Sequence, residues 1–172
     1  VLRGGPPFKD GEPGWNRSHF FGDFNSSKLG LLLNMKDPAA VEIARRLISW
    51  ADIYIESFRP GTVDSFGIGY DVARELNPSI IMASTCLMGQ SGPASSIAGF
   101  GYHAGAMAGF YEVTGWPDLA PDGPWVAYTD TIAPRFLLAT LLAAIDHRRR
   151  SGEGQHIDAA QIEMGLHFLA PE

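Results

Sequence analysis

The chain has 172 residues, of which 45% are hydrophobic and 19% are charged, and its formal net charge is −6. This length and composition fit one domain with a hydrophobic core of its own, and the acidic balance argues against a nucleic-acid partner. A single cysteine, Cys86, excludes an intrachain disulfide and a cysteine-rich metal site, and it fits the reducing conditions of the cytoplasm.

Short apolar stretches alternate with helical patterns along the chain. In chain order, the sequence predicts a loop over 1–24, a helix over 38–50, a strand over 53–55, a helix over 70–77, a strand over 79–85, a helix over 102–113, a loop over 114–124, a strand over 125–128, a helix over 132–150, a strand over 156–160 and a helix from 161. The first helix has the clearest start, because Asp37 is a preferred N-cap and Pro38 suits the first helical position. Strands that alternate with helices predict βαβ units and a mainly parallel sheet. We therefore expect residues 1–172 to form a single α/β domain with a Rossmann-like sheet and flanking helices.

A lone carboxylate, Asp130, stands where the predicted strand 125–128 hands over to the long helix. Asp is a preferred N-cap, so helix capping explains this residue without any catalytic role. Ligands of parallel α/β sheets bind outside the carboxyl ends of the strands, so a role in a site is the alternative. The residues alone favour the cap.

Three other patterns have a chemical interpretation beside a structural one. Gly99–Ala104 fits the dinucleotide pattern G-x-G-x-x-G/A, but it follows a predicted loop instead of a strand, so close helix packing is favoured. Cys86 and His103 could form a nucleophile pair, yet a cysteine near a strand end is more often a small buried hydrophobe. Lys28 and Arg59 lie in turn-like settings that can hold a phosphate.

The basic run Arg148–Arg150 closes the predicted long helix. Cations are favourable at a helix C-terminus because of the helix dipole and the free carbonyl groups there. The apolar part of the same helix is too short to span a bilayer, and we expect no membrane partner.

Several linked stretches together carry a family resemblance over about residues 20–170. They are ADIYIESFRPGTVDSFGIGYDVARELNPSIIMAS, MGQSGP, AGFGYHAGAMAGFYEVTG and YTDTIAPRFLLATLLAAIDHRRRSGEGQHIDAAQIE. In order and spacing they resemble the class III CoA-transferases, the family of formyl-CoA transferase. The resemblance implies a part of the large CoA-binding domain of that fold, with the small domain and the returning C-terminal segment outside this chain. It also implies an interlaced homodimer.

The resemblance implies a function for named residues. Asp130 falls on the nucleophilic aspartate of the family, which attacks an acyl-CoA thioester and passes through an anhydride and an aspartyl-CoA thioester. The positions implied at the coenzyme A site are Asn25, Lys28, Ser57, Phe58, Arg59, Gly89 and Gln90. The expected substrates are an acyl-CoA and a small carboxylic acid, with no metal and no covalently bound cofactor. The acid that often follows "GF" in the family is Gly101 here.

Two alternatives stay open. The α-methylacyl-CoA racemases share the fold and the aspartate, but they pair it with a histidine at the position of Phe100 here, so a transferase fits better. A non-catalytic CoA-binding subunit is the other alternative, because several motif positions differ from the family pattern.

Overall fold

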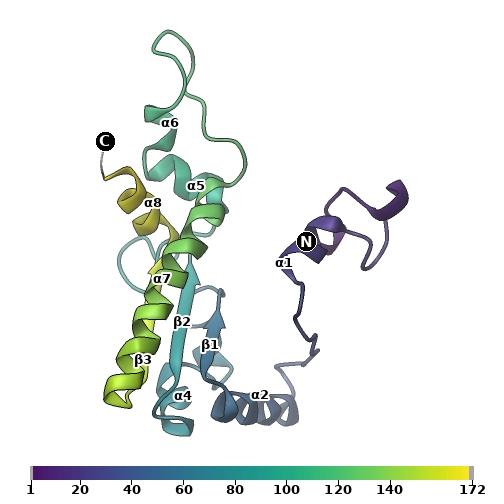
Figure 1. Cartoon of the computed structure of the whole chain (residues 1–172), viewed down its shortest axis with the longest axis vertical. Coiled ribbons are helices and arrows are strands. Elements are labelled where there is room, and N and C mark those ends of the chain that lie inside the picture. Colours follow the sequence, from purple (N-terminus) through teal and green to yellow (C-terminus); the bar gives the residue numbers. More distant parts are fainter. Residues whose placement is uncertain (1, 171–172) are drawn as a thin grey trace. The chain divides into compact units, whose positions relative to one another are not determined.

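The computed structural model describes residues 2–170, and these form a smaller unit that extends to Leu33 and a larger unit that begins at Asn34. Figure 1 shows the elements of both units in chain order. The larger unit contains the sheet and the helices packed on it. The expectation that the whole chain is a single domain stays a prediction.

The smaller unit is more helical than the sequence suggested. It contains the 3₁₀ turns η1 (Leu2–Gly4) and η2 (Lys9–Gly11) and the helix α1 (His19–Phe24), so the predicted loop over 1–24 is wrong in its last part. Ser18 starts α1, because its hydroxyl oxygen accepts a hydrogen bond from the backbone N–H of Phe21 at 3.1 Å. The glycines and prolines before Ser18 are typical of a loop, so the sequence did not indicate this helix start.

The sheet of the larger unit has the strands β1 (Ile53–Glu56), β2 (Ile81–Cys86) and β3 (Gln155–Ala160), in that spatial order. Both pairings are parallel, which confirms the predicted α/β fold with a parallel sheet. The register places Glu56, Ser84 and Asp158 in one row across the three strands.

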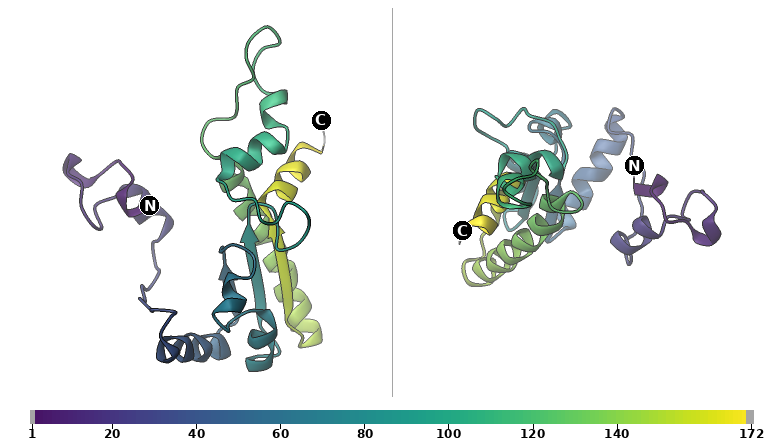
Figure 2. Two further views of the ribbon diagram at one scale, coloured as in Figure 1. Left: turned by 180° about the vertical axis from the view of Figure 1, so that it is seen from behind. Right: turned by 90° about the horizontal axis from the view of Figure 1, so that it is seen from above.

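Helices cover both faces of the sheet. The helices are α2 (Pro38–Trp50), α3 (Thr62–Ser65), α4 (Tyr70–Leu76), α5 (Gly101–Met107), α6 (Phe110–Val113), α7 (Tyr128–Ser151) and α8 (Gln161–Leu169). Met82 points to a core shared with α2, α3 and α4, whereas its neighbours Ile81 and Ala83 point to a core shared with α7. Side chains alternate along a strand, so a central strand covered on both faces must be apolar throughout. Figures 1 and 2 show α7 lying along one face of the sheet, with α5 and α8 at the carboxyl ends of the strands.

Two predicted elements differ from the structure near α7. Residues 125–128 do not form a strand, and α7 begins at Tyr128. Val126 has φ 66°, a left-handed conformation that no regular strand contains. The predicted helix 102–113 is divided into α5 and α6 at Gly109, whose φ is 96°.

The connection from α7 to β3 depends on a close backbone approach at Gly154. A Cβ atom added to Gly154 would lie 2.0 Å from the carbonyl oxygen of Ile80, the residue just before β2. The backbone N–H of Gly154 donates to the carbonyl of Pro78 at 3.1 Å, and that of Gln155 donates to the carbonyl of Ile80 at 3.1 Å. Only glycine permits the two backbones to meet in this way.

Candidate active site

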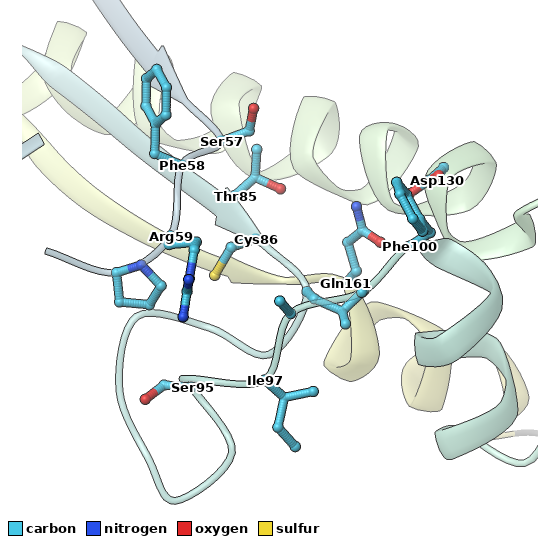
Figure 3. Close-up of a pocket in the computed structure, with 14 residues that line it drawn as sticks. Ser57, Phe58, Arg59, Thr85, Cys86, Ser95, Ile97, Phe100, Asp130 and Gln161 are labelled. Atoms are coloured by element: carbon cyan, nitrogen blue, oxygen red, sulfur yellow. The ribbon is translucent and has the colours of Figure 1, made fainter. Parts of the chain in front are cut away.

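A cavity of about 280 Å³ opens at the carboxyl ends of β1 and β2, and we refer to it as the Asp130 pocket. Its wall comes from four regions: the loop after β1 (57–60), the end of β2 and the next residue (85–87), the loop before α5 (95–100), and the first turns of α7 and α8. Figure 3 shows the side chains of these regions around the pocket. This is the position at which open α/β sheets bind their ligands.

Asp130 is the third residue of α7 and has an exposed side chain at this pocket. The N-cap of α7 is Ala127, so the interpretation of Asp130 as the cap is wrong. The helix begins earlier than the sequence suggested, which moves Asp130 from the cap into the first turn. A negative charge there is favoured by the helix dipole. Within residues 2–170, no hydrogen bond or ion pair engages the Asp130 carboxylate, which leaves its oxygen atoms available to a ligand.

Gly101, the first residue of α5, makes room for Asp130. A Cβ atom at Gly101 would lie 2.8 Å from Cγ of Asp130 and 2.9 Å from its backbone nitrogen. The preceding residue of α7, Thr129, is fully buried, and its hydroxyl lies 3.0 Å from the carbonyl oxygen of Gly101. The same hydroxyl lies 3.2 Å from Oε1 of Gln161, the first residue of α8. The starts of three helices therefore meet beside the Asp130 carboxylate.

Ser57, Phe58 and Arg59 line the same pocket, on the loop that leaves β1. Glu56, the last residue of β1, holds this loop, because its buried carboxylate accepts the backbone N–H of Phe58 at 2.8 Å through Oε2. Arg59 forms no ion pair with any residue of the described chain, so its positive charge faces the pocket unneutralised. The structure thus brings three predicted coenzyme A contacts together with Asp130.

Gly89 and Gln90 lie on the loop after β2, outside the lining of the Asp130 pocket. The backbone N–H of Gln90 lies 2.9 Å and 3.0 Å from the two carboxylate oxygens of Asp158 on β3. Gly89 has φ 84°, which only glycine adopts without strain, and this turn lets the loop reach Asp158. In this structure the two residues anchor the loop, and their contact with coenzyme A stays a prediction.

Asn25 and Lys28 belong to the smaller unit, just after α1. Lys28 donates from Nζ to the carbonyl of Phe24 at 2.7 Å and to Oδ1 of Asn25 at 3.2 Å. Asn25 in turn donates to the carbonyl of Phe21 at 2.9 Å. The two predicted residues are therefore neighbours in a small polar cluster, and their role at coenzyme A also stays a prediction.

Cys86 and Gln161 also line the pocket, although neither was among the residues predicted for the site. Burial raises the pKa of the Cys86 thiol, and the charges of Asp158 and Glu56 add to this effect, against two backbone hydrogen bonds that lower it. Each residue stands at or directly after the carboxyl end of a predicted strand, a signal that could have identified both. Among the described residues no hydrogen bond joins His103 to the Cys86 thiol, and Nδ1 of His103 instead accepts the backbone N–H of Phe100 at 3.0 Å.

The sequence matches the family model described as CoA-transferase family III over residues 1–172. The chain belongs to this family. It is 36% identical over 167 residues to the succinate–glutarate CoA-transferase of Agrobacterium fabrum, a match that covers 96% of this chain and 42% of that protein. It is also 36% identical over 154 residues to the succinyl-CoA:glutarate CoA-transferase of Mus musculus, with 90% and 34% of the two chains covered.

A solved structure supports the same family III assignment. The crystal structure of a CAIB/BAIF family protein from Brucella suis superposes with a TM-score of 0.88 at 31% identity, and the match covers 97% of this chain and 44% of that chain. The family III chain therefore spans less than half the length of these relatives. Across the described residues, no helix has the length and apolar character needed to cross a membrane. The same part of the chain contains no group of three or more His, Cys, Asp or Glu residues suited to a metal ion.

Proposed function

We propose that this chain is the catalytic part of an enzyme that moves coenzyme A from an acyl-CoA thioester to a carboxylic acid, with Asp130 as the nucleophile. One observation carries the proposal: the Asp130 carboxylate is exposed at the pocket lined by Arg59 and at the carboxyl end of the sheet. Membership of family III supports this assignment.

The reaction begins when an oxygen of the Asp130 carboxylate attacks the thioester carbonyl carbon. A C–O bond forms, the C–S bond breaks, and coenzyme A leaves as a thiolate, so that Asp130 carries a mixed anhydride. The thiolate then attacks the Asp130 carbonyl carbon, which releases the first carboxylate and leaves an aspartyl-CoA thioester. The acceptor carboxylate displaces coenzyme A from this thioester, and a final attack by the thiolate on the new acyl group regenerates Asp130. The nucleophile is a carboxylate oxygen, so its attack on the thioester releases no proton, and the negative charge lies in the first turn of α7, where the helix dipole is favourable to it.

The proposed substrates are short dicarboxylic acids and their coenzyme A thioesters. Both named relatives act on succinate or succinyl-CoA and glutarate, according to their names. A cavity of about 280 Å³ has room for such an acyl group and for the thiol end of coenzyme A, but not for its nucleotide. In this proposal Ser57, Phe58 and Arg59 contact coenzyme A at the Asp130 pocket, and Lys28 and Asn25 bind its nucleotide end. Cationic side chains are needed there because the chain as a whole is acidic.

The proposal extends to the assembly and its location. The family resemblance supports an interlaced homodimer, and light scattering on the full-length protein should give the mass of a dimer. The single cysteine supports a cytoplasmic location, where thiols stay reduced.

The test of this function is the Asp130→Asn variant of the full-length protein, with Asp146→Asn on the outer surface of α7 as its matched control. Asparagine keeps the size of the side chain, but its amide cannot form the anhydride. Acyl-CoA is added, hydroxylamine traps the acylated residue, and mass spectrometry locates the hydroxamate. We expect a hydroxamate at Asp130 in the parent and in Asp146→Asn, and neither adduct nor transfer in Asp130→Asn. Transfer at the parental rate by a folded Asp130→Asn variant would refute the proposal.

The trapping experiment and a deuterium-exchange assay together separate the alternatives. A non-catalytic CoA-binding subunit would bind coenzyme A without any acylated residue in the parent protein. A racemase would exchange the C2 hydrogen of a 2-methylacyl-CoA for deuterium. The structure offers less support for the racemase, because Phe100 occupies the family histidine position and the nearby His103 is already bonded to a backbone N–H.

A further inference from the structure

Gln161 presents an amide group to the Asp130 pocket from the first position of α8. It follows directly on β3, so the end of a strand fixes its backbone on one side and a helix fixes it on the other. Figure 3 shows its side chain extending from α8 into the pocket on the side where Asp130 and Phe100 lie. The side chain is half-buried and therefore restricted in the rotamers it can adopt.

One end of this amide is held by a buried group. The hydroxyl of Thr129, a residue with 0% exposure, lies 3.2 Å from Oε1 of Gln161. Helix α8 approaches Thr129 closely, since a Cβ atom at Gly165 would lie 3.4 Å from the Thr129 methyl carbon. Apart from this contact with Thr129, the Gln161 side chain has no hydrogen bond to any described residue. The other end of the amide is therefore available to a ligand.

The charge beside the pocket decides which end of the amide faces inward. The Asp130 carboxylate lies on the same wall, and a carbonyl oxygen turned toward it would be repelled, whereas an NH₂ group is attracted. The Thr129 hydroxyl has one proton and faces two acceptors, the carbonyl oxygen of Gly101 at 3.0 Å and Oε1 of Gln161 at 3.2 Å, which share it in a three-centre hydrogen bond. That arrangement holds the oxygen against Thr129 and leaves Nε2 on the pocket side.

We propose that Gln161 donates a hydrogen bond from Nε2 to the carbonyl oxygen of the bound acyl group and to the oxyanion that this oxygen becomes. The inference rests on the proposed function, because the oxyanion forms when Asp130 attacks the thioester. As the C–O bond forms, the carbonyl π electrons move to this oxygen, and they return when the C–S bond breaks and the thiolate leaves. A fixed donor aimed at the developing charge lowers the barrier more than it strengthens substrate binding. Thr129 is the positioning residue of this donor.

Gln161→Met is the first test, made in the full-length protein with Gln155→Met as the matched control. Methionine has a similar length and volume but no donor. The rate at which acyl-CoA acylates Asp130 in a single turnover should fall about 100-fold, the usual loss for one oxyanion donor, while KM changes by less than about threefold. Gln155→Met should acylate within about threefold of the parent.

Gln161→Glu keeps an oxygen for the Thr129 hydroxyl and nearly the same shape, so it tests the chemistry even if the methionine variant folds poorly. It should lose at least about 100-fold in acylation rate, because it replaces the donor with a negative charge. Thr129→Val should lower the acylation rate about tenfold, whereas Thr129→Ser, which keeps the hydroxyl, should retain most of the parental rate. Thr140→Val, on the exposed face of the same helix, should change the rate little.

Two outcomes would overturn the role of Gln161. One is acylation at the parental rate by folded Gln161→Met or Gln161→Glu. The other is a rise in KM of about 100-fold with an unchanged acylation rate, which would assign Gln161 to ground-state binding. A parent protein that forms no adduct at Asp130 would instead refute the proposed function itself, so the two failures are distinguishable.

Discussion

Gly101→Ala should damage the site because it adds one methyl group where the backbone of α7 leaves no space. The new Cβ atom would lie 2.8 Å from Cγ of Asp130, 2.9 Å from its Oδ1 and 2.9 Å from its backbone nitrogen, whereas ordinary contacts begin near 3.4 Å. The carboxylate can rotate away, but the backbone nitrogen cannot, so α5 and α7 must separate by about 0.5 Å. Overpacking of this kind lowers the free energy of unfolding by about 1–3 kcal/mol. Displacement of the nucleophile should also slow acylation of Asp130 by about 10- to 100-fold.

Gly105→Ala is the matched control on the same helix. A Cβ atom at Gly105 meets only Cε2 of Tyr111, at an ordinary 3.9 Å. In the interior of a helix, alanine in place of glycine raises the free energy of unfolding by about 0.5–1 kcal/mol. Urea unfolding and single-turnover acylation of both variants provide the comparison. Gly101→Ala with the stability and the acylation rate of Gly105→Ala would refute the packing argument.

Three further predictions concern groups around the sheet. Arg148 donates to the carbonyl of Asp52 at 2.9 Å and pairs with its carboxylate at 3.2 Å, so Arg148→Ala should lower the free energy of unfolding by about 1–2 kcal/mol in a urea titration. The control Arg149→Ala removes no ion pair or hydrogen bond among the described residues and should change this free energy by less than about 0.5 kcal/mol. Burial, with Glu56 and Asp64, raises the pKa of Tyr54 from 10.0 to about 12, so the stabilisation from its protonated phenol is complete below pH 10 and is lost as the pH rises to about 12. Tyr54→Phe should remove this loss, and an unchanged pH dependence of unfolding would contradict the assignment. Alkylation of Cys86 by iodoacetamide should rise with pH through a midpoint above the value of about 8.5 for a free thiol, because burial raises its pKa; a midpoint below that value in a mass-spectrometric time course would contradict this.

The parallel sheet and the first helix could be predicted because their signals are local. Asp37 accepts the backbone N–H of Ala39 at 2.9 Å, as expected of an N-cap, and the three apolar stretches at 53–55, 79–85 and 156–160 became β1, β2 and β3. The predicted strand at 125–128 is equally apolar, but it lies at the end of a loop with three prolines, and Val126 adopts a left-handed conformation. Composition does not report such a backbone angle.

The site was predicted in part, for a related reason. The position of Asp130 at the start of a long helix and the motif around Arg59 were both visible in the sequence, and the structure places the two residues at one pocket. The contact of Gly101 with Asp130 and the bond from Thr129 to Gln161 were not visible, because they join residues 29 and 32 positions apart on three different helices. The interpretation of Arg148 through the helix dipole likewise missed its bond to the start of β1, which depends on how α7 packs on the sheet.

Gly154 sets which side chains can reach a pocket at the other end of the sheet. The close approach of its backbone to Ile80 allows β3 only one alignment beside β2, and every later residue of β3 inherits that alignment. A slip by one residue would turn each side chain of β3 to the opposite face and would deliver a neighbour of Gln161 to the pocket in its place. The alignment of β3 at Gly154 therefore fixes which residue reaches the pocket at the other end of the strand. A substitution at position 161 can therefore change this wall of the pocket without moving β3. An insertion or deletion between positions 154 and 161 would instead change the alignment of the whole strand.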